Sequence, residues 1–556
     1  MRSIQGRTRW SGLATMMGAA AAAVLQFLTL PAFAGFELPP GERITNLPAI
    51  PRAMPQKEAY EIYDPVIGRN FDVKNLWMRA DLRVRPEMRN NTCFGQAINA
   101  NGSCNTFGTK GNPGGVGANV GNKGNDFFVQ QWIRLGIGYD LSPDVNFYME
   151  IIDSATWGGN GTATNAGNGG DPLNHNCSAT ATGSCRLGVR AAYMLVRNLM
   201  DVQGLSMKVG RQYVVFGNHS LFGHFDWANT GYSHDGVMFA YQTKGWDTYL
   251  GWFRNSESDL NQAAAVGSGS GNIAGTGTRD ANRDADMIIF YNQLKMVPGM
   301  VIEPYYVYYK NNYASADNAA FGLGTPKHSN QTRHMVGNRI EVRKGGFDFS
   351  NEIAWQFGQM GQAGACTGDQ KCLHINAWAT RNWIGYTMYN TMWKPRLAFN
   401  FDYASGDGRA AKCGAGAAAG SCGTANTFEN FFPTNHIHMG YMDVMAWKNM
   451  LSPSVNFQAR PTARDHIELW YTNMNLASSQ DCWYRGAQGC YVFSNANNTK
   501  KHIGDEIDVS WTRMFADGKV SFQATYGTLF AGGYLTSTLN SQVNQHWAYV
   551  QVWLNF

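Results

Sequence analysis

The sequence predicts an all-β protein: a transmembrane antiparallel up-and-down β-barrel of about 18 strands, with long external loops and short periplasmic turns. Three observations predict it. Segments of about ten residues alternate polar and apolar side chains, long and short connections alternate between them, and 63 Gly and 72 aromatic residues (25 Tyr, 30 Phe, 17 Trp) accompany only 15% charged residues. A barrel strand exposes every second side chain to lipid, so it scores as polar on average. A large secreted β-sandwich or propeller is the alternative.

The predicted strands have the length of a tilted membrane strand. In the first of them Leu82 and Val84 share an apolar face, whereas Arg83 and Arg85 share a polar face. The predicted strands are 76–85, 127–139, 145–153, 187–197, 205–212, 234–242, 247–254, 285–294, 301–309, 333–343, 347–357, 374–388, 395–403, 446–460, 465–474, 504–513, 519–528 and 545–556. A closed barrel has no free edge, so the last strand should pair with the first.

The N-terminal 34 residues are typical of a secretory signal peptide. Three arginines precede an apolar run over 13–30, and Ala32-Phe33-Ala34 forms a small-residue cleavage site. We expect residues 1–34 to be removed; a transmembrane anchor is the alternative, disfavoured by Pro31. Nothing in the charge balance of the remaining chain points to nucleic acid as a partner.

Residues 35–70 contain six prolines, which preclude regular structure over most of the segment. We interpret 35–70 as a periplasmic N-terminal extension, which either folds against or into the barrel mouth or remains a disordered leader. Residues 71–556 form the predicted outer-membrane β-barrel.

The cysteines form five close pairs, each in a predicted long loop rich in small and polar residues. The pairs are Cys93/Cys104, Cys177/Cys185, Cys366/Cys372, Cys413/Cys422 and Cys482/Cys490. Neither C-x-x-C nor C-x-x-C-H occurs, so zinc-ribbon and haem-attachment spacings are missing. In an oxidising compartment, the simplest interpretation is a local disulfide bond within each loop, with unpaired thiols as the alternative.

Two stretches carry a specific resemblance. The first, 209–237, contains Val209, Gly210, Arg211, Gln212, Phe216, Gly217, Asp226, Trp227, Asn229, Thr230, Asp235 and Gly236. The second, 431–450, contains Pro433, Thr434, His436, Gly440 and Asp443. With 401–408, 451–457 and 504–515, they resemble the alginate export porin family of Gram-negative outer membranes.

This resemblance implies an 18-stranded monomeric pore in the outer membrane, in contact with the lipid bilayer and lipopolysaccharide. The best-known members of the family pass an anionic polysaccharide. The local cysteine pairs are not part of the family pattern, and they put a shared loop gating in doubt because a stapled loop moves less.

The alternation assigns charged side chains to the lumen. The expected cations are Arg79, Arg83, Arg85, Arg134, Arg190, Lys208, Arg254, Arg339, Arg343, Arg396 and Arg460. The expected anions are Asp81, Glu150, Glu303, Glu341, Glu352, Asp402, Glu468, Glu506 and Asp508. We expect Arg79, Arg83, Arg85, Arg134, Arg190, Arg339, Arg343 and Arg396 to line the pore and bind anions. For about half of these charges, ion pairs between neighbouring strands are the favoured alternative.

Histidines and methionines gather in and around two predicted loops, and such ligands suit copper. They are His219, His224, His234, His436, His438, Met439, Met442, Met445 and Met450. Packing and hydrogen bonding within the loops is the favoured interpretation, since spacing without geometry is weak evidence. We therefore expect no metal and no cofactor.

The sequence contains none of the motifs G-x-S-x-G, Walker loop, H-E-x-x-H or G-x-G-x-x-G, so we do not expect an enzyme. The predicted function is an outer-membrane channel of the alginate-export type that passes small or anionic solutes. Whether these include an anionic polysaccharide is left open by the sequence. A surface barrel for adhesion or docking, with disulfide-stapled loops, and a copper uptake pore are the alternatives.

Overall fold

The computed structural model describes residues 73–91, 94, 126–157, 187–228, 231–256, 285–311, 331–361, 371–408, 423–486, 490–492, 498–539 and 543–555. All of them belong to one unit, 43–556. The predicted signal peptide (1–34) and N-terminal extension (35–70) lie outside the described residues.

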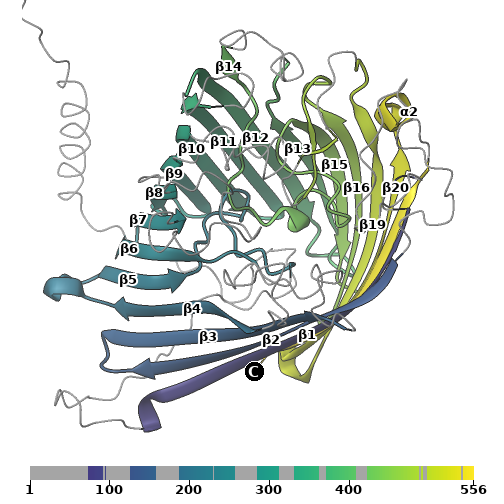
Figure 1. Ribbon diagram of the computed structural model, residues 1–556. Coiled ribbons are helices and arrows are strands. Elements are labelled where there is room, and N and C mark those ends of the chain that lie inside the picture. The colour runs from purple at the N-terminus through teal and green to yellow at the C-terminus, as the bar shows by residue number, and fades with distance from the viewer. Residues whose placement is uncertain are drawn as a thin grey trace, which may run out of the picture. The chain divides into compact units, whose positions relative to one another are not determined.

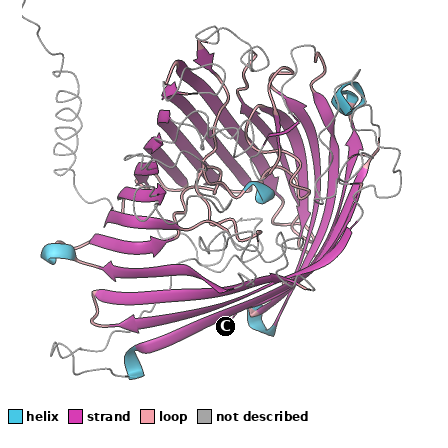
Figure 2. Cartoon of the chain, in the orientation of Figure 1, coloured by secondary structure: helices cyan, strands magenta, loops and turns pink. Residues whose placement is uncertain are grey.

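The described residues form a closed antiparallel barrel of 18 strands (Figures 1 and 2). The first nine are β1 (Leu76–Asn90), β2 (Asp126–Asp140), β3 (Val145–Thr156), β4 (Leu187–Val196), β5 (Leu205–Gln212), β6 (His234–Gln242), β7 (Trp246–Ser256), β8 (Ala285–Leu294) and β9 (Met300–Asn311). The other nine are β10 (Gln331–Lys344), β11 (Phe347–Met360), β12 (Leu373–Thr387), β13 (Arg396–Ala404), β15 (Met450–Ala459), β16 (Asp465–Leu476), β19 (His502–Phe515), β20 (Val520–Ala531) and β21 (Gln545–Asn555).

Short elements decorate the barrel. They are the strand β14 (Thr424–Ala425), which pairs in parallel with β12, the hairpin β17 (Trp483–Tyr484) and β18 (Cys490–Val492), the helix α2 (Gly533–Leu539), and the 3-10 turns η1 (Val73–Asn75), η3 (Leu199–Asp201), η8 (Asn435–Ile437) and η9 (Ala516–Gly518). Among the described residues, no helix is long and apolar enough to cross a membrane.

Each barrel strand pairs with its neighbours in sequence, and β21 returns to pair with β1. The closing register places Leu82 opposite Leu554 and Val84 opposite Val552. The predicted fold class and pairing of the last strand with the first are therefore confirmed. This closure leaves no strand edge exposed to lipid. An exposed edge would be costly, because hydrocarbon offers the backbone no hydrogen-bond partners.

All 18 predicted strands correspond to barrel strands, and the largest differences are at two ends. β1 continues to Asn90, whereas the prediction stops at 85. β15 begins at Met450, whereas the prediction begins at 446. Residues 446–449 are fully buried inside the barrel instead, so the apolar side chains of Ala446 and Trp447 pack in the interior and do not contact lipid.

The two faces of the wall differ as the alternation predicts. Large apolar side chains such as Leu250, Ile353 and Val509 point outward and are exposed. Arg83, Gln523 and other polar side chains point inward and are buried. The end of the barrel with the short connections is called the turn end below, and the opposite end the loop end; the family resemblance implies that the turn end is periplasmic.

The predicted disulfide bonds fall mostly on parts of the chain that the structure does not describe. Cys372 and Cys482 have described side chains, and both are disulfide-bonded. The backbone of Cys490 is described in β18, but its side chain is not. The other seven cysteines lie outside the described residues: Cys93, Cys104, Cys177, Cys185, Cys366, Cys413 and Cys422.

In each of the five expected pairs, at least one cysteine side chain lies outside the described residues. In Cys93/Cys104, Cys177/Cys185 and Cys413/Cys422 both members lie outside the described residues. In the other two pairs one side chain is described and its expected partner is not. The local pairings therefore stay predictions.

Substituting an arginine for a mid-wall apolar residue tests the lipid-facing assignment. Val509 lies in the middle of β19 and is 46% exposed on the outer face. We expect Val509→Arg to destabilise the protein by about 2–4 kcal/mol in reversible denaturant unfolding in lipid vesicles.

Val202→Arg is the matched control, since Val202 is equally exposed but follows the turn η3 at the turn end. It should leave the free energy of unfolding unchanged. Equal effects of the two substitutions would contradict the assignment of Val509 to the lipid-facing surface.

Candidate functional site: two segments that narrow the lumen

Two connecting segments from the loop end fold into the barrel and narrow its lumen (Figures 1 and 2). Segment A covers 213–233, between β5 and β6, and 213–228 and 231–233 of it are described. Segment B covers 426–449, between β14 and β15. The segments run side by side: the backbone N–H of Gly223 donates to the carbonyl of Phe432 (2.8 Å), and that of Phe432 donates to Leu221 (3.0 Å).

An apolar core packs both segments against the wall, mainly at β8 to β10 and also at β16 and β19 to β21. Phe216 of segment A stacks on Tyr291 of β8, with ring centroids 4.3 Å apart. The core contains residues of segment A (Phe216, Phe222), segment B (Phe431, Met445, Trp447) and strands β8 to β10 (Met287, Tyr291, Tyr305, Val307, Met335). Burying this surface inside the barrel favours the inward fold of the segments, because apolar area leaves water.

Asp226 connects segment A to the opposite side of the wall. Its Oδ2 accepts a hydrogen bond from Arg134 of β2 (2.8 Å), and its Oδ1 accepts one from Arg190 of β4 (2.9 Å). Burial alone would raise the pKa of the Asp226 carboxyl. Arg134, His224 and Arg190 outweigh that effect and hold this pKa well below its usual range. The carboxylate therefore stays ionised, and the two ion pairs persist, throughout the physiological pH range.

Trp227 is the centre of a three-layered stack. The Arg85 guanidinium of β1 lies 3.4 Å from the centroid of the Trp227 ring. On the other face of the indole, the His436 ring of segment B lies 3.7 Å away and almost parallel, at 7°. Arg85 also donates to the Trp227 carbonyl oxygen (2.8 Å). The stack thus joins β1, segment A and segment B through cation–π and ring contacts.

Hydrogen bonds orient segment B around His436. His436 Nδ1 lies 3.2 Å from Asp443 Oδ2. Burial lowers the pKa of the His436 imidazole, and Asp443 only partly offsets this, so the ring is neutral at pH 7. Nearby, Gly440 adopts a φ of +84°, and a Cβ there would lie 2.2 Å from Glu506 Oε1. Only glycine therefore lets the segment approach the β19 wall this closely.

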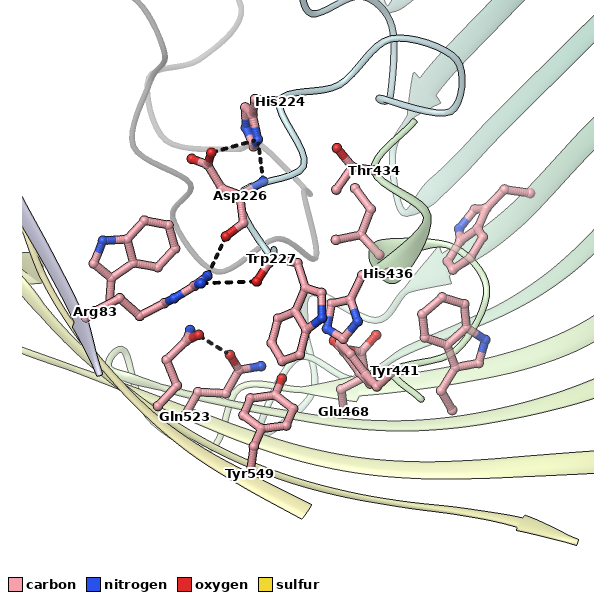
Figure 3. Close-up of a pocket in the computed structure, with 15 residues that line it drawn as sticks. Arg83, His224, Asp226, Trp227, Thr434, His436, Tyr441, Glu468, Gln523 and Tyr549 are labelled. Atoms are coloured by element: carbon pink, nitrogen blue, oxygen red, sulfur yellow. Dashed lines mark hydrogen bonds and ion pairs between the residues drawn. The ribbon is translucent and has the colours of Figure 1, made fainter. Parts of the chain in front are cut away.

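A narrow gap remains beside the stack (Figure 3). Its volume is about 60 Å³, which holds a few water molecules and excludes a sugar ring. Trp227 and His436 face it from the segments, while Arg83, Gln523 and Tyr549 face it from the wall. Arg83 donates to the carbonyl oxygens of Asp226 and Trp227, which fixes the guanidinium at the edge of the gap.

A second cavity, rich in arginine, lies between the segments and β10 to β13. Its volume is about 220 Å³. Four guanidinium groups line it, and so do two carboxylates: Arg339, Arg343, Arg381, Arg396, Glu341 and Asp348. We call this the arginine cavity.

The eight arginines proposed to line the pore all point into the barrel, but most of them have carboxylate partners. The ion pairs are Arg79–Asp81, Arg85–Glu87, Arg134–Asp226, Arg190–Asp226, Arg339–Glu303, Arg339–Glu341, Arg343–Glu341 and Arg396–Asp348. Ion pairing therefore involves most of these residues, but not mainly between neighbouring strands as expected. Arg339–Glu303 joins neighbouring strands, whereas Arg79, Arg85 and Arg343 pair within their own strands and Arg190 pairs with segment A. A carboxylate partner offsets the cost of burying each arginine charge away from water.

Two cations are not where the alternation assigned them. Arg254 lies on the outer face, paired with Asp286 (2.7 Å). It shares that face with Leu250 and Trp252, so its assignment to the lumen was wrong. Arg460 is exposed in the turn that follows β15.

Sequence analysis missed three buried cations: Arg333, Arg381 and Lys448. Arg333 and Arg381 share the inward parity of their strands, so the period-two pattern contained them. Arg381 is flanked on that face by Ala377 and Ala379, which hid the polar character of the face. Lys448 pairs with Glu429 (3.0 Å) within segment B, where no strand pattern exists.

The family-motif residues have distinct positions. Gln212 Nε2 lies within hydrogen-bond distance of the carbonyl oxygens of Lys208 and Gly236, at the point where β5 ends. Arg211 and Asp235 pair across the outer face (3.0 Å). Asn229 lies outside the described residues.

Arg211, Asp235, Arg254 and Asp286 follow one another across β5 to β8 and form the outer-face charge row. Asp235 is opposite Arg254 in the strand register, and Arg254 is paired with Asp286. All four side chains lie near the loop end of their strands.

The histidines of the segments lie in separate surroundings. His219 and His224 contact each other edge to face, with centroids 5.0 Å apart, while His436 stacks on Trp227. His438 Nε2 bonds the Asn218 carbonyl oxygen (2.7 Å). Over the described ranges, no group of three or more His, Cys, Asp or Glu side chains could hold a metal ion.

Removing the Asp226 charge tests its role in holding segment A. We expect Asp226→Asn to release the segment, because Arg134 and Arg190 lose the carboxylate they share and breaking a buried pair costs about 3–5 kcal/mol. The single-channel conductance in planar bilayers should rise or fluctuate between levels.

Asp235→Asn is the control, since Asp235 belongs to the same motif but is 56% exposed on the outer face. Its conductance should equal that of the unaltered protein. A steady, unaltered conductance of Asp226→Asn would contradict the anchoring role.

Comparison with known proteins gives the family. The sequence model described as "Alginate export" matches residues 145–549, which is most of the chain. No curated protein matches the chain.

Solved structures that resemble the barrel include Pseudomonas aeruginosa OccK5 (OpdH), with 9% identity, TM-score 0.46 and coverage of 86% of this chain and 98% of that one. Acinetobacter baumannii OccAB3 has 9% identity, TM-score 0.48 and coverage of 86% and 99%. The family match, over a closed barrel with an outer apolar face and a polar lumen, shows that this chain belongs to the alginate export family of outer-membrane porins of Gram-negative bacteria.

Proposed function

We propose that this porin is a passive diffusion channel for small solutes, with a preference for anions. The arginine cavity carries the proposal: four guanidinium groups line it against two carboxylates. Arg339 and Arg381 also pair with Glu303 and Asp402, but these two carboxylates do not line the cavity. The surface that a solute meets therefore presents more cations than anions, which raises the local concentration of anions.

Arg343 is the guanidinium in this cavity that a passing anion reaches most easily. Its side chain is 30% exposed, whereas the side chain of Arg339 is 7% exposed. An arginine offers five N–H donors in a planar fork, so Arg343 can contact a solute carboxylate while it remains beside Glu341.

The narrow gap beside Trp227 favours small solutes over a polysaccharide strand. A volume of about 60 Å³ is far below that of one sugar ring. A solute larger than this gap could pass beside Trp227 only if segments A and B moved, and the two ion pairs of Asp226 and the apolar core oppose that movement.

Several further expectations belong to this proposal. Residues 1–34 would be removed on export, and residues 35–70 would follow as a periplasmic extension. Local disulfide bonds would restrain the external loops, and the barrel would act as a monomer surrounded by lipid and lipopolysaccharide without catalysing a reaction.

Reversal potentials in a potassium chloride gradient test the preference for anions. We expect the unaltered protein to prefer chloride, and Arg343→Ala to lower the chloride-to-potassium permeability ratio about twofold or more, because the most exposed lining cation is removed.

Arg513→Ala is the matched control. Arg513 is also paired with a carboxylate, that of Asp465, but it points away from the lumen on β19. A preference for potassium, or equal effects of the two substitutions, would contradict the proposal.

A further inference from the structure

We infer that the barrel contains a separate binding site for a small organic acid, one that has a single carboxylate and an apolar body, at Lys208. The inference goes beyond the proposed function, because binding at Lys208 does not require net transport or an anion-selective pore. It rests on the chemistry of one side chain and the cavity into which it points.

Lys208 is a buried cation without a carboxylate. It points inward from β5, and the residue is 6% exposed. Its neighbours in register are Leu195 of β4 and Met238 of β6, neither of which carries a charge. Among the described residues the ammonium has no hydrogen bond or ion pair, and it lies over the Tyr193 ring, 4.2 Å from Nζ to the ring centroid.

This situation differs from that of the buried lysine of segment B. Lys448 is also buried, and it pairs with Glu429 at 3.0 Å. A buried ammonium without such a partner is costly, and a cation–π contact compensates only part of the cost. Lys208 is therefore suited to accept a carboxylate from outside the protein.

The cavity beside Lys208 has room for such a ligand. Its volume is about 470 Å³, and it shares no lining residue with the arginine cavity or the narrow gap. It extends from segment A to the turn between β4 and β5, where Asn198 and Gly204 line it. A solute at the turn end therefore meets it before the narrow gap.

The lining of the cavity indicates the body of the ligand. The apolar and aromatic side chains that line it are Tyr193, Leu195, Tyr213, Phe216, Met238 and Tyr249. Ring faces of this kind stack on a ring or pack against a short alkyl chain. Pockets that combine apolar walls with few polar groups select a ligand by one anchoring contact.

Few polar groups accompany the lysine. Ser206, Gln242 and Gln293 line the cavity and are neutral donors and acceptors. Arg197 lines it near the turn end, where its guanidinium donates to Asn146. No carboxylate lines the cavity within the described residues, so no acid there repels an incoming anion. An aromatic monocarboxylate such as benzoate has the charge, ring and size that this lining accommodates.

Isothermal titration of the full-length protein in detergent tests the site, with benzoate as the probe and benzamide as its uncharged equivalent. We expect benzoate to bind at least about tenfold more tightly than benzamide, a difference of about 1.4 kcal/mol. Lys208→Met should lower the affinity for benzoate by about tenfold or more, while Lys208→Arg should keep it within about threefold.

Lys244→Met is the control, because Lys244 is an exposed lysine in the turn between β6 and β7 at the same end of the barrel. It should bind benzoate as the unaltered protein does. Heat-dependent migration in gel electrophoresis reports whether each variant is folded. If Lys208→Met does not fold, two measurements still test the site: the affinity of the unaltered protein for benzoate relative to benzamide, and the affinity of Lys208→Arg for benzoate.

Equal affinities for benzoate and benzamide, or an unaltered affinity in folded Lys208→Met, would overturn the inference. These outcomes are distinguishable from failure of the proposed function, since titration measures binding without conduction. A barrel that binds benzoate through Lys208 but prefers potassium ions would retain this site and lose the proposed anion preference.

Discussion

The pairing of β1 with β21 is the constraint on which the rest of the structure depends. In hydrocarbon, every backbone N–H and C=O group of the wall must find a partner within the wall. The register that joins Leu82 to Leu554 and Val84 to Val552 meets this requirement. It also fixes which side chains face inward, because the side-chain period of a strand is two. The polar lumen and the apolar outer surface follow from that single closure.

Once the wall is closed, the interior is divided between two kinds of surface. Segments A and B pack an apolar core against β8 to β10 and against β16 and β19 to β21, and they contact β1, β2 and β4 through charged side chains. Charges removed from water need partners of opposite sign. The inward arginines accordingly form pairs with acids and carbonyl oxygens, and the lumen is a mixed surface with a local surplus of cations instead of a uniformly positive tube.

Much of the fold follows from the sequence, whereas the arrangement of the lumen does not. The alternation of polar and apolar side chains and the alternation of long and short connections can both be recognised along the chain. They therefore predict the strands and the closure of the barrel. The meeting of Trp227 with His436 joins residues far apart in the chain, and neither side chain lies in a strand. The motif residues could be found one by one, but no local pattern states that the two motifs stack on each other or that residues 446–449 turn inward. The misplaced Arg254 shows a second limit, because a charge at the end of a strand is solvated by headgroups and water on the outer face as well.

The outer-face charge row has a consequence for the surrounding bilayer. β5 has only eight residues, fewer than the 9 to 11 that a tilted strand commonly uses to cross. Arg211 at the end of β5 and Asp235, opposite it on β6, both point outward, and they reduce the height of the wall that acyl chains can cover. The bilayer beside β5 to β8 should therefore become locally thinner. The strands β10 to β12 have 14 or 15 residues, so the bilayer beside them can keep its ordinary thickness. We therefore expect the bilayer around this barrel to be thinner beside β5 to β8 than beside β10 to β12.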